Sequence, residues 1–200
     1  MNTRLRPLSE LCRKDVSTVD PRARPDSIFT YIDITSVNNT LKQIECPQKV
    51  KGAEASVRAR RIVRVGDVLV ATTRPNLNSV ALISKEFDGE ICSTGFCVLR
   101  CGPELDPFYL FAFVQSKRFV DSLTDLVQGA LYPAVSDKQV LSQTIPWVSM
   151  DRQRDTAERI SSQLERVRAA TEAATHQLED LQQLPQKLLA QVFDFDSIRP

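Results

Sequence analysis

The sequence predicts an α+β fold, with a mixed globular domain over residues 1–150 and one long helix over residues 151–200. Three observations support this expectation. Short runs rich in β-branched and aromatic side chains lie in the first half of the chain, as is typical of strands. A strongly apolar helical stretch follows them. The last quarter carries a seven-residue apolar repeat, which indicates a coiled coil.

The expected strands lie in three segments. Residues 28–37 alternate roughly in period two and predict a first strand. Residues 58–75 contain two short β-like runs on either side of Gly66. Residues 80–100 predict a hairpin that turns at Asp88-Gly89, because two apolar runs flank this turn-forming dipeptide.

Two helices are expected before the repeat begins. Asp106 can cap a helix that has Pro107 at its first position. The helix is expected to continue to Val127, with apolar residues on more than one face, as in a core helix. Ser136 with Gln139 three residues later fits a capping box, which predicts a second, short helix.

The C-terminal repeat places apolar and small residues at alternating spacings of four and three. The stripe consists of Ile160, Leu164, Val167, Thr171, Ala174, Leu178 and Leu181, then Leu188 and Val192 beyond an interruption at Pro185. The other positions are mostly polar, so the stripe is narrow and needs a partner helix. Its small residues at Thr171 and Ala174 favour an antiparallel pair that crosses there.

The composition excludes several classes of protein. Hydrophobic residues make up 42% of the chain, enough for a real core, and no run of about eighteen apolar residues predicts a membrane span. The first residues lack the apolar run of a signal peptide, which predicts a cytoplasmic protein. The five cysteines form no CxxC motif and the chain has one histidine, so we expect neither a metal site nor a disulfide framework.

Charge is distributed unevenly along the chain. Residues 1–80 hold fourteen Lys and Arg against eight Asp and Glu, whereas residues 81–200 hold twelve against seventeen. The basic half favours an anionic partner. Phosphate-binding glycine loops, nucleophile elbows and paired histidine-carboxylate clusters are absent from the sequence, so we expect neither a catalytic site nor a cofactor.

The loop over residues 72–79 carries groups that can read DNA bases. Arg74 can bind guanine through two hydrogen bonds, and Asn76 or Asn78 can bind adenine in the same way. Thr73 adds a hydroxyl that can donate or accept. An ordinary solvated turn is the alternative interpretation.

Four arginines form the densest basic cluster of the chain: Arg58, Arg60, Arg61 and Arg64. Their strand spacing sends alternate side chains to one side, and contact with DNA phosphates is the functional interpretation. The alternative is a solvated edge strand that its charges protect from pairing.

A third segment, residues 128–138, combines polar and aromatic side chains. It contains Gln128, Tyr132, Ser136 and Lys138. These residues lie beside a predicted helix N-terminus, where backbone amides favour an anion such as phosphate. A structural turn followed by a helix cap is the alternative.

Several short motifs follow one another along nearly the whole chain. They are Tyr31-Ile32-Asp33, Val65-Gly66-Asp67-Val68-Leu69 with Thr72-Thr73-Arg74-Pro75, Ser93-Thr94-Gly95-Phe96 with Val98-Leu99-Arg100, Tyr109-Leu110, Gly129 to Pro133, Ile145-Pro146, Gln153, and Leu188 to Phe193. In this order they resemble the DNA specificity subunits of type I restriction-modification systems.

The resemblance implies a target recognition domain followed by a spacer helix that serves dimerisation. Family members usually carry two such domains, whose helices pair antiparallel, and this chain has one of each. The resemblance therefore implies a non-enzymatic subunit that recognises double-stranded DNA. It would direct a separate methyltransferase subunit, with or without a restriction translocase subunit, to a bipartite site. A homodimer, or a pairing with a second half-length subunit, would supply the missing half.

Two other functions fit parts of the pattern. A coiled-coil adaptor or inhibitor could keep the shape of a specificity subunit and bind the methyltransferase without reading DNA. Loss of salt-sensitive binding to any duplex would favour that alternative. A stand-alone modification enzyme would need to bind S-adenosylmethionine, and the sequence offers no site for it.

Overall fold

The computed structural model describes residues 4–129 and 131–193. The chain divides into two compact units, Met1–Glu158 and Arg159–Pro200. The long helix α5 (Met150–Phe193) begins in the first unit and makes up the described part of the second. Among the described residues, none of the helices combines the length and the apolarity that crossing a membrane would require.

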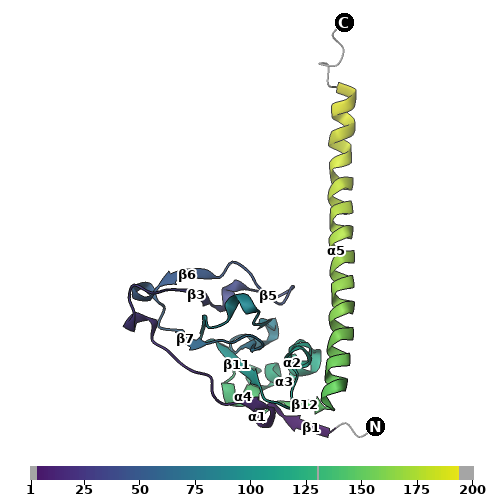
Figure 1. Ribbon diagram of the computed structural model, residues 1–200. Coiled ribbons are helices and arrows are strands. Elements are labelled where there is room, and N and C mark those ends of the chain that lie inside the picture. The colour runs from purple at the N-terminus through teal and green to yellow at the C-terminus, as the bar shows by residue number, and fades with distance from the viewer. Residues whose placement is uncertain (1–3, 130, 194–200) are drawn as a thin grey trace. The chain divides into compact units, whose positions relative to one another are not determined.

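The first unit contains short strands and four short helices (Figure 1). The strands are β1 (Arg4–Pro7), β2 (Cys12–Arg13), β3 (Ile28–Ile32), β4 (Val37–Asn38), β5 (Gln43–Ile44), β6 (Gln48–Lys51), β7 (Ala59–Ile62), β8 (Val68–Ala71), β9 (Val80–Leu82), β10 (Ile91–Ser93), β11 (Phe96–Cys101) and β12 (Thr144–Trp147). The helices are α1 (Leu8–Leu11), α2 (Pro107–Val114), α3 (Lys117–Thr124) and α4 (Asp137–Leu141).

Two four-stranded sheets form the body of this unit. One is antiparallel, in the order β2-β11-β8-β9. The other is mixed, in the order β6-β3-β10-β7, with β3 and β10 parallel. Two small ladders, β1-β12 and β4-β5, complete the pairing. The predicted α+β class is confirmed.

Strand β8 lies between two core clusters. Val68 and Val70 pack against the cluster that contains the helices α2 and α3. Leu69 and Ala71 pack on the opposite side, in the cluster that contains Ile32 of the mixed sheet. Because side chains alternate across a strand, both faces of β8 are buried, which explains its uninterrupted apolar sequence. Burial of one such side chain stabilises the fold by roughly 1.5–3 kcal/mol.

The hairpin predicted over residues 80–100 is wrong. Strand β9 pairs with β8 in the antiparallel sheet, whereas β10 pairs with β3 and β7 in the mixed sheet. Ile83 and Phe87 lie buried in the core between the sheets. Their burial carries the chain from one sheet to the other, so the turn at Asp88-Gly89 connects two layers.

The strand expected over residues 28–37 is shorter than predicted. β3 ends at Ile32, and Asp33 caps a single 3-10 turn with a reciprocal capping box to Ser36. The Asp33 carboxylate accepts the backbone N–H of Ser36 at 3.1 Å. Local side-chain capping of this kind competes with the ladder, and the chain pairs again only in β4.

The helix expected from Asp106 to Val127 is two helices. Asp106 caps α2 as predicted, because its carboxylate accepts two backbone N–H groups of the first turn. A second cap at Ser116, whose hydroxyl accepts the N–H of Phe119, starts α3. The short helix opened by Ser136 and its capping box is confirmed as α4.

A buried ion pair joins two of the sequence motifs. Asp67 is 1% exposed and accepts two hydrogen bonds from Arg100, Nε to Oδ1 at 2.9 Å and Nη2 to Oδ2 at 2.8 Å. The same carboxylate accepts the N–H of Arg64 at 2.8 Å. This arrangement holds the turn at Gly66, whose φ of 84° is a conformation that glycine adopts without strain.

Gln153 fastens the beginning of α5 to the rest of its unit. Its side chain is fully buried. The amide oxygen accepts the N–H of Asp106 at 2.9 Å, and the amide nitrogen donates to the carbonyls of Glu104 and Val148, both at 2.9 Å. Burial without these bonds would cost several kcal/mol, so they tie the first turn of α5 to the rest of the first unit.

The rest of α5 is one helix whose apolar stripe is exposed. The helix continues through Pro185, where the sequence pattern had predicted an interruption. Proline removes one backbone donor, and the turns on both sides keep the helix intact. The leucines and valine at positions 164, 167, 178, 181 and 188 are 42–61% exposed. Pairing of this stripe in a coiled coil stays a prediction.

Candidate nucleic-acid interface

The structure brings two of the three predicted DNA-binding segments side by side. Residues 72–74 run antiparallel to residues 133–135, with a bridge between Thr73 and Ala134. The N–H of Arg74 donates to the carbonyl of Pro133 at 2.8 Å, and residue 135 donates to the carbonyl of residue 72 at 2.8 Å. The loop over residues 72–79 and the segment over residues 128–138 therefore form one surface.

Arg61 connects the arginine cluster to this surface. Its Nη2 lies 2.7 Å from Oδ2 of Asp137, the first residue of α4. Its Nη1 donates to the carbonyl of Phe96 at 2.7 Å. All three predicted segments are thus in contact, although they are up to 80 positions apart in the sequence. Sequence spacing alone could not indicate this contact.

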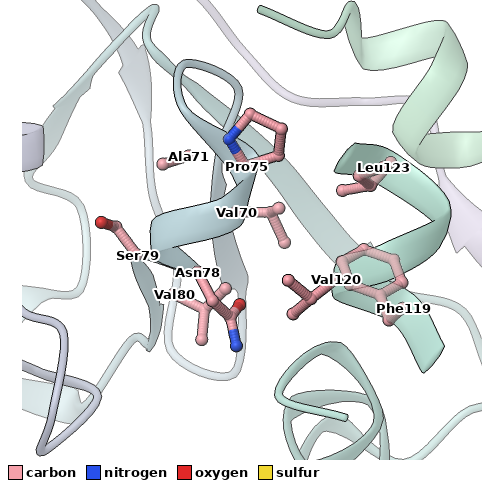
Figure 2. A pocket seen from close by; sticks show the side chains of 9 residues that line it. All are labelled: Val70, Ala71, Pro75, Asn78, Ser79, Val80, Phe119, Val120 and Leu123. Carbon is pink, nitrogen blue, oxygen red and sulfur yellow. The ribbon is translucent and has the colours of Figure 1, made fainter. Parts of the chain in front are cut away.

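Apolar packing supports the loop over residues 72–79 from behind, as Figure 2 shows. Pro75 of the loop and Phe119 and Leu123 of α3 line a cavity of about 10 Å³, which is no larger than one water molecule needs. The loop therefore rests on α3 as a firm support. Arg74 and Asn78 at its two ends both adopt the left-handed conformation, with φ of 50° and 47°, a strained geometry that concentrates at functional sites.

The candidate base-reading side chains of this loop differ in accessibility. Arg74 and Asn76 are exposed, and neither side chain has a partner among the described residues. Asn78 instead lines the cavity in Figure 2, and its amide lies 3.5 Å from the carbonyl of Gln115. Asn78 is turned toward the protein, which leaves Arg74 and Asn76 as the outward-facing pair.

The arginine cluster divides into free and occupied members. Arg58 is exposed, and its guanidinium has no partner in the described part of the chain. Arg60 donates to the carbonyl of Val57 at 3.0 Å and lies 2.9 Å from Asp20. The paired state of Arg60 and Arg61 reduces their capacity to bind phosphates, whereas the exposed Arg58 and Arg64 remain available.

Asp20 is the acceptor that occupies Arg60. Its hydrogen bond with Arg22, supported by Arg60, lowers the pKa of the Asp20 carboxyl to about 2. The carboxylate therefore stays charged, and able to pair with Arg60, at every pH at which DNA binding would be measured. The sequence analysis missed this partner because it lies 40 positions before the arginine.

The third segment combines a structural cap with exposed side chains. The Ser136 hydroxyl accepts the N–H of Gln139 at 3.3 Å, and the Gln139 side chain accepts the N–H of Ser136 at 2.8 Å. Ser136 is therefore used as a helix cap. Gln128 and Lys138 are exposed, and Tyr132 is 86% exposed. Leu131, which the sequence analysis did not select, is 87% exposed beside it.

The thiols of Cys12 and Cys92 are buried. Burial raises the pKa of the Cys12 and Cys92 thiols to about 12, so both stay protonated and unreactive at neutral pH. Within the described ranges, no group of three or more histidine, cysteine, aspartate or glutamate residues could hold a metal ion. The exposed donors over a rigid support suit hydrogen bonding to base edges and phosphates.

Comparison with known proteins gives two close structural matches. The crystal structure of an HsdS subunit from Thermoanaerobacter tengcongensis superposes with a TM-score of 0.82 and 37% sequence identity, over 94% of this chain and 49% of that one. A structure from a study of complex assembly and conformational transition of the type I R-M system has a TM-score of 0.85 and 36% identity, over 95% of this chain and 49% of the other.

Two further comparisons found nothing: no family model matches the sequence, and no curated protein matches it. The chain spans about half the length of the structures that it matches. The resemblance to type I specificity subunits is confirmed, and this chain is similar, over about half of their length, to the HsdS subunits of type I restriction-modification systems.

Proposed function

We propose that the chain is a non-catalytic, sequence-specific DNA recognition subunit of a type I restriction-modification system. The observation that carries the proposal is the convergence of the three polar and basic segments on one surface of an HsdS-like fold. In this proposal Arg74 and Asn76 read base edges. Arg58 and Lys138 contact phosphates, which position the protein without reading sequence.

The second part of the proposal is a homodimer that pairs through α5. The exposed stripe supports it, because water-exposed leucines at heptad spacing are stabilised only when another helix covers them. The Thr171 hydroxyl donates to the Val167 carbonyl at 2.9 Å, so it can enter a helix interface without an unsatisfied polar group. Crossing at Thr171 and Ala174 allows the two helices to approach closely.

The length of the helix relates to the DNA site. Residues 151–184 span roughly 50 Å at 1.5 Å per residue. Two recognition domains held by an antiparallel pair would then meet major-groove faces whose centres lie about 34 to 36 Å or a multiple apart. Because an isologous dimer presents identical domains in opposite directions, its site is an interrupted palindrome with a fixed spacer.

The proposed partners are double-stranded DNA, a methyltransferase subunit and, in systems that contain one, a restriction translocase subunit. Exposed leucines near the C-terminal end of α5 support the proposal that a further subunit binds the pair of helices. Leu184 and Leu189 flank the stripe and are 45% and 58% exposed. They widen it beyond the two positions per heptad that a helix pair covers. A further subunit that buries this wider face is part of the proposal.

Methylation mapping is the direct test of the recognition proposal. We expect cells that express this chain with its methyltransferase to carry one interrupted palindromic methylation motif. Arg74→Ala should relax the motif at particular base pairs, since a bidentate contact contributes about 1–3 kcal/mol of discrimination. A motif that Arg74→Ala leaves unchanged would remove that loop from base reading.

Salt dependence separates phosphate contacts from base contacts. Arg58→Ala should weaken binding to all duplexes and lower the log-log salt slope by about 0.9. Substitution of both Arg60 and Arg61 by alanine should lower it by at most about 1.8, and by less if their pairing with Asp20 and Asp137 persists on DNA. Glu86→Ala, which removes a charge of opposite sign in another segment, is the control.

An adaptor or inhibitor that binds the methyltransferase without reading DNA is the second candidate. The internal pairing of Arg60 and Arg61 favours it, because paired arginines contribute less to a polyanion site. Titration of the purified chain with duplex DNA at two salt concentrations discriminates between the candidates. Stable binding to the methyltransferase without salt-sensitive binding to duplex DNA would establish the adaptor.

A further inference from the structure

Among the described residues of the first unit, the most exposed large apolar side chains are those of two neighbours, Leu131 and Tyr132. They are 87% and 86% exposed. The Tyr132 hydroxyl has no hydrogen-bond partner among residues 4–129 and 131–193. An aromatic ring and a branched aliphatic side chain that both face water are unfavourable relative to a buried position. Such a pair marks a contact surface.

The backbone after this pair is held firmly. Residues 133 and 135 form backbone hydrogen bonds of 2.8 Å with the loop over residues 72–79. Ser136 and Gln139 close a capping box directly afterwards, and the Arg61 ion pair holds the first residue of α4. The two side chains therefore stand on a fixed base, which lowers the entropy that they would lose on insertion into a partner.

The surroundings of the pair are polar and cationic. Arg74 is tied to the next residue, because its N–H donates to the Pro133 carbonyl, and its own side chain is exposed. Lys138 and Gln128, on either side in the sequence, are exposed as well. Cations and amides around an isolated apolar pair complement a polyanion that has an apolar interior, and duplex DNA has this chemistry.

We propose that Leu131 and Tyr132 form a wedge that enters the base stack of the bound duplex. Tyr132 stacks on a base at one step and Leu131 fills the space beside it. The step is partly unstacked and the duplex bends there, as with other apolar wedges. The inference rests on the proposed DNA recognition and adds a mode of contact to it, since the readout would depend on how easily that step deforms.

The size of the pair argues against a protein partner as its occupant. A stable protein interface buries about 800 Å² on each side, whereas one aromatic side chain contributes about 150–250 Å². In the sequence the pair is flanked by Gly129, Pro133 and Ala134, which add no large apolar side chain to it. Two side chains are enough, however, to occupy a single base step.

The test uses a duplex that carries the methylation motif of this protein, with 2-aminopurine placed in turn at each position. The intact chain should raise the 2-aminopurine fluorescence at one step, because that base leaves the stack. Tyr132→Ala should abolish the rise and weaken binding about ten- to one-hundredfold, the range of base-aromatic stacking. Tyr132→Phe should retain the rise, and Leu131→Ser should reduce it.

A second measurement reports the wedge independently. An abasic site opposite the affected base lowers the unstacking cost, so the intact chain should bind that duplex more tightly, and Tyr132→Ala should lose the gain. Ile28→Ala, which removes a 66% exposed apolar side chain from β3, is the matched control and should behave as the unmodified protein.

The outcomes separate the wedge from the proposed function. If the unmodified chain binds no duplex, DNA recognition itself is wrong. If it binds, but no position brightens and Tyr132→Ala binds equally well, only the wedge is wrong. Loss of methyltransferase binding by Tyr132→Ala with unchanged DNA binding would assign the pair to the protein partner and would also overturn the wedge.

Discussion

The two units of this chain differ in how far their apolar side chains are buried. In Met1–Glu158 the sheets and short helices enclose side chains such as Phe96, Leu99 and Leu110, each fully buried. In the described part of Arg159–Pro200 the stripe of α5 stays open, with Leu164 at 42% and Leu181 at 61% exposure. The first unit closes its own core, whereas the stripe of the second unit would be covered only by the helix pairing that we propose.

The largest effect on stability should come from a substitution in the core of the first unit, compared with one in the apolar stripe of α5. Phe96→Ala should destabilise the first unit by roughly 3–5 kcal/mol, because it removes a fully buried ring between the two sheets. Leu178→Ala, on the exposed stripe, should leave the unfolding of that unit unchanged within roughly 0.5 kcal/mol and weaken self-association. Urea unfolding and sedimentation measure the two effects. Equal destabilisation by both variants would contradict the contrast between the units.

A charge placed in the stripe should separate the proposed dimer. Ala174→Glu puts a carboxylate into the expected helix crossing, where burial of an unpaired charge costs several kcal/mol. The chain should then sediment as a monomer at micromolar concentration. Ala173→Glu places the same charge at the neighbouring position, outside the stripe, and should leave the dimer intact. Dissociation of both variants, or of neither, would show that this stripe is not the interface.

Hydrogen exchange should show the same contrast along the backbone. Amides of β8 and β11 lie in a sheet with both faces covered and should open only with global unfolding. Amides of α5 beyond residue 159 should exchange much faster in dilute solution and slow down as concentration rises. The comparison needs two protein concentrations, with β8 as the internal reference. Concentration-independent protection of α5 would mean that the helix needs no partner.

The smallest effect concerns the ion pairs at the surface of the first unit. The hydrogen bond from Arg22 and the contact with Arg60 lower the pKa of Asp20 to about 2. Because the pKa of Asp20 is lower in the folded state, its ionised carboxylate stabilises the fold above the ordinary pKa of about 3.9. This contribution to the free energy of unfolding is lost as the pH falls toward the folded-state pKa. Asp20→Asn should therefore be slightly less stable at pH 7, and the difference should disappear near pH 2. Asp26→Asn is the control in acid unfolding curves.

Several features of the fold followed from local sequence signals. The caps at Asp106 and Ser136 are reproduced in the structure, because capping depends on groups only two or three residues away. The heptad pattern predicted a long helix over residues 151–200, since periodicity reports the face of a single element. The observed helix is Met150–Phe193, and residues 194–200 lie outside the described residues. Local signals could not show whether the strands on either side of Asp88 pair as a hairpin. Their partner strands were decided by burial of Ile83 and Phe87 between two sheets.

The candidate site shows the same limit. Exposed Arg74 and Tyr132 could be selected from residue type alone, and the order of motifs indicated the family. Their mutual position could not be foreseen, because it depends on a bridge between Thr73 and Ala134, which lie 61 positions apart. The occupied state of Arg60 and Arg61 depends on distant carboxylates in the same way.

By itself, the sequence determined the α+β class, the helix caps, the long C-terminal helix and the resemblance to type I specificity subunits. These depend on periodicity, spacing and short-range hydrogen bonds, which neighbouring residues specify. The tertiary structure alone decided which strands share a sheet, that Asn78 faces inward, and that three separate segments form one surface. The reason is that burial and long-range pairing select among local possibilities of similar energy, and only the folded chain brings their partners together.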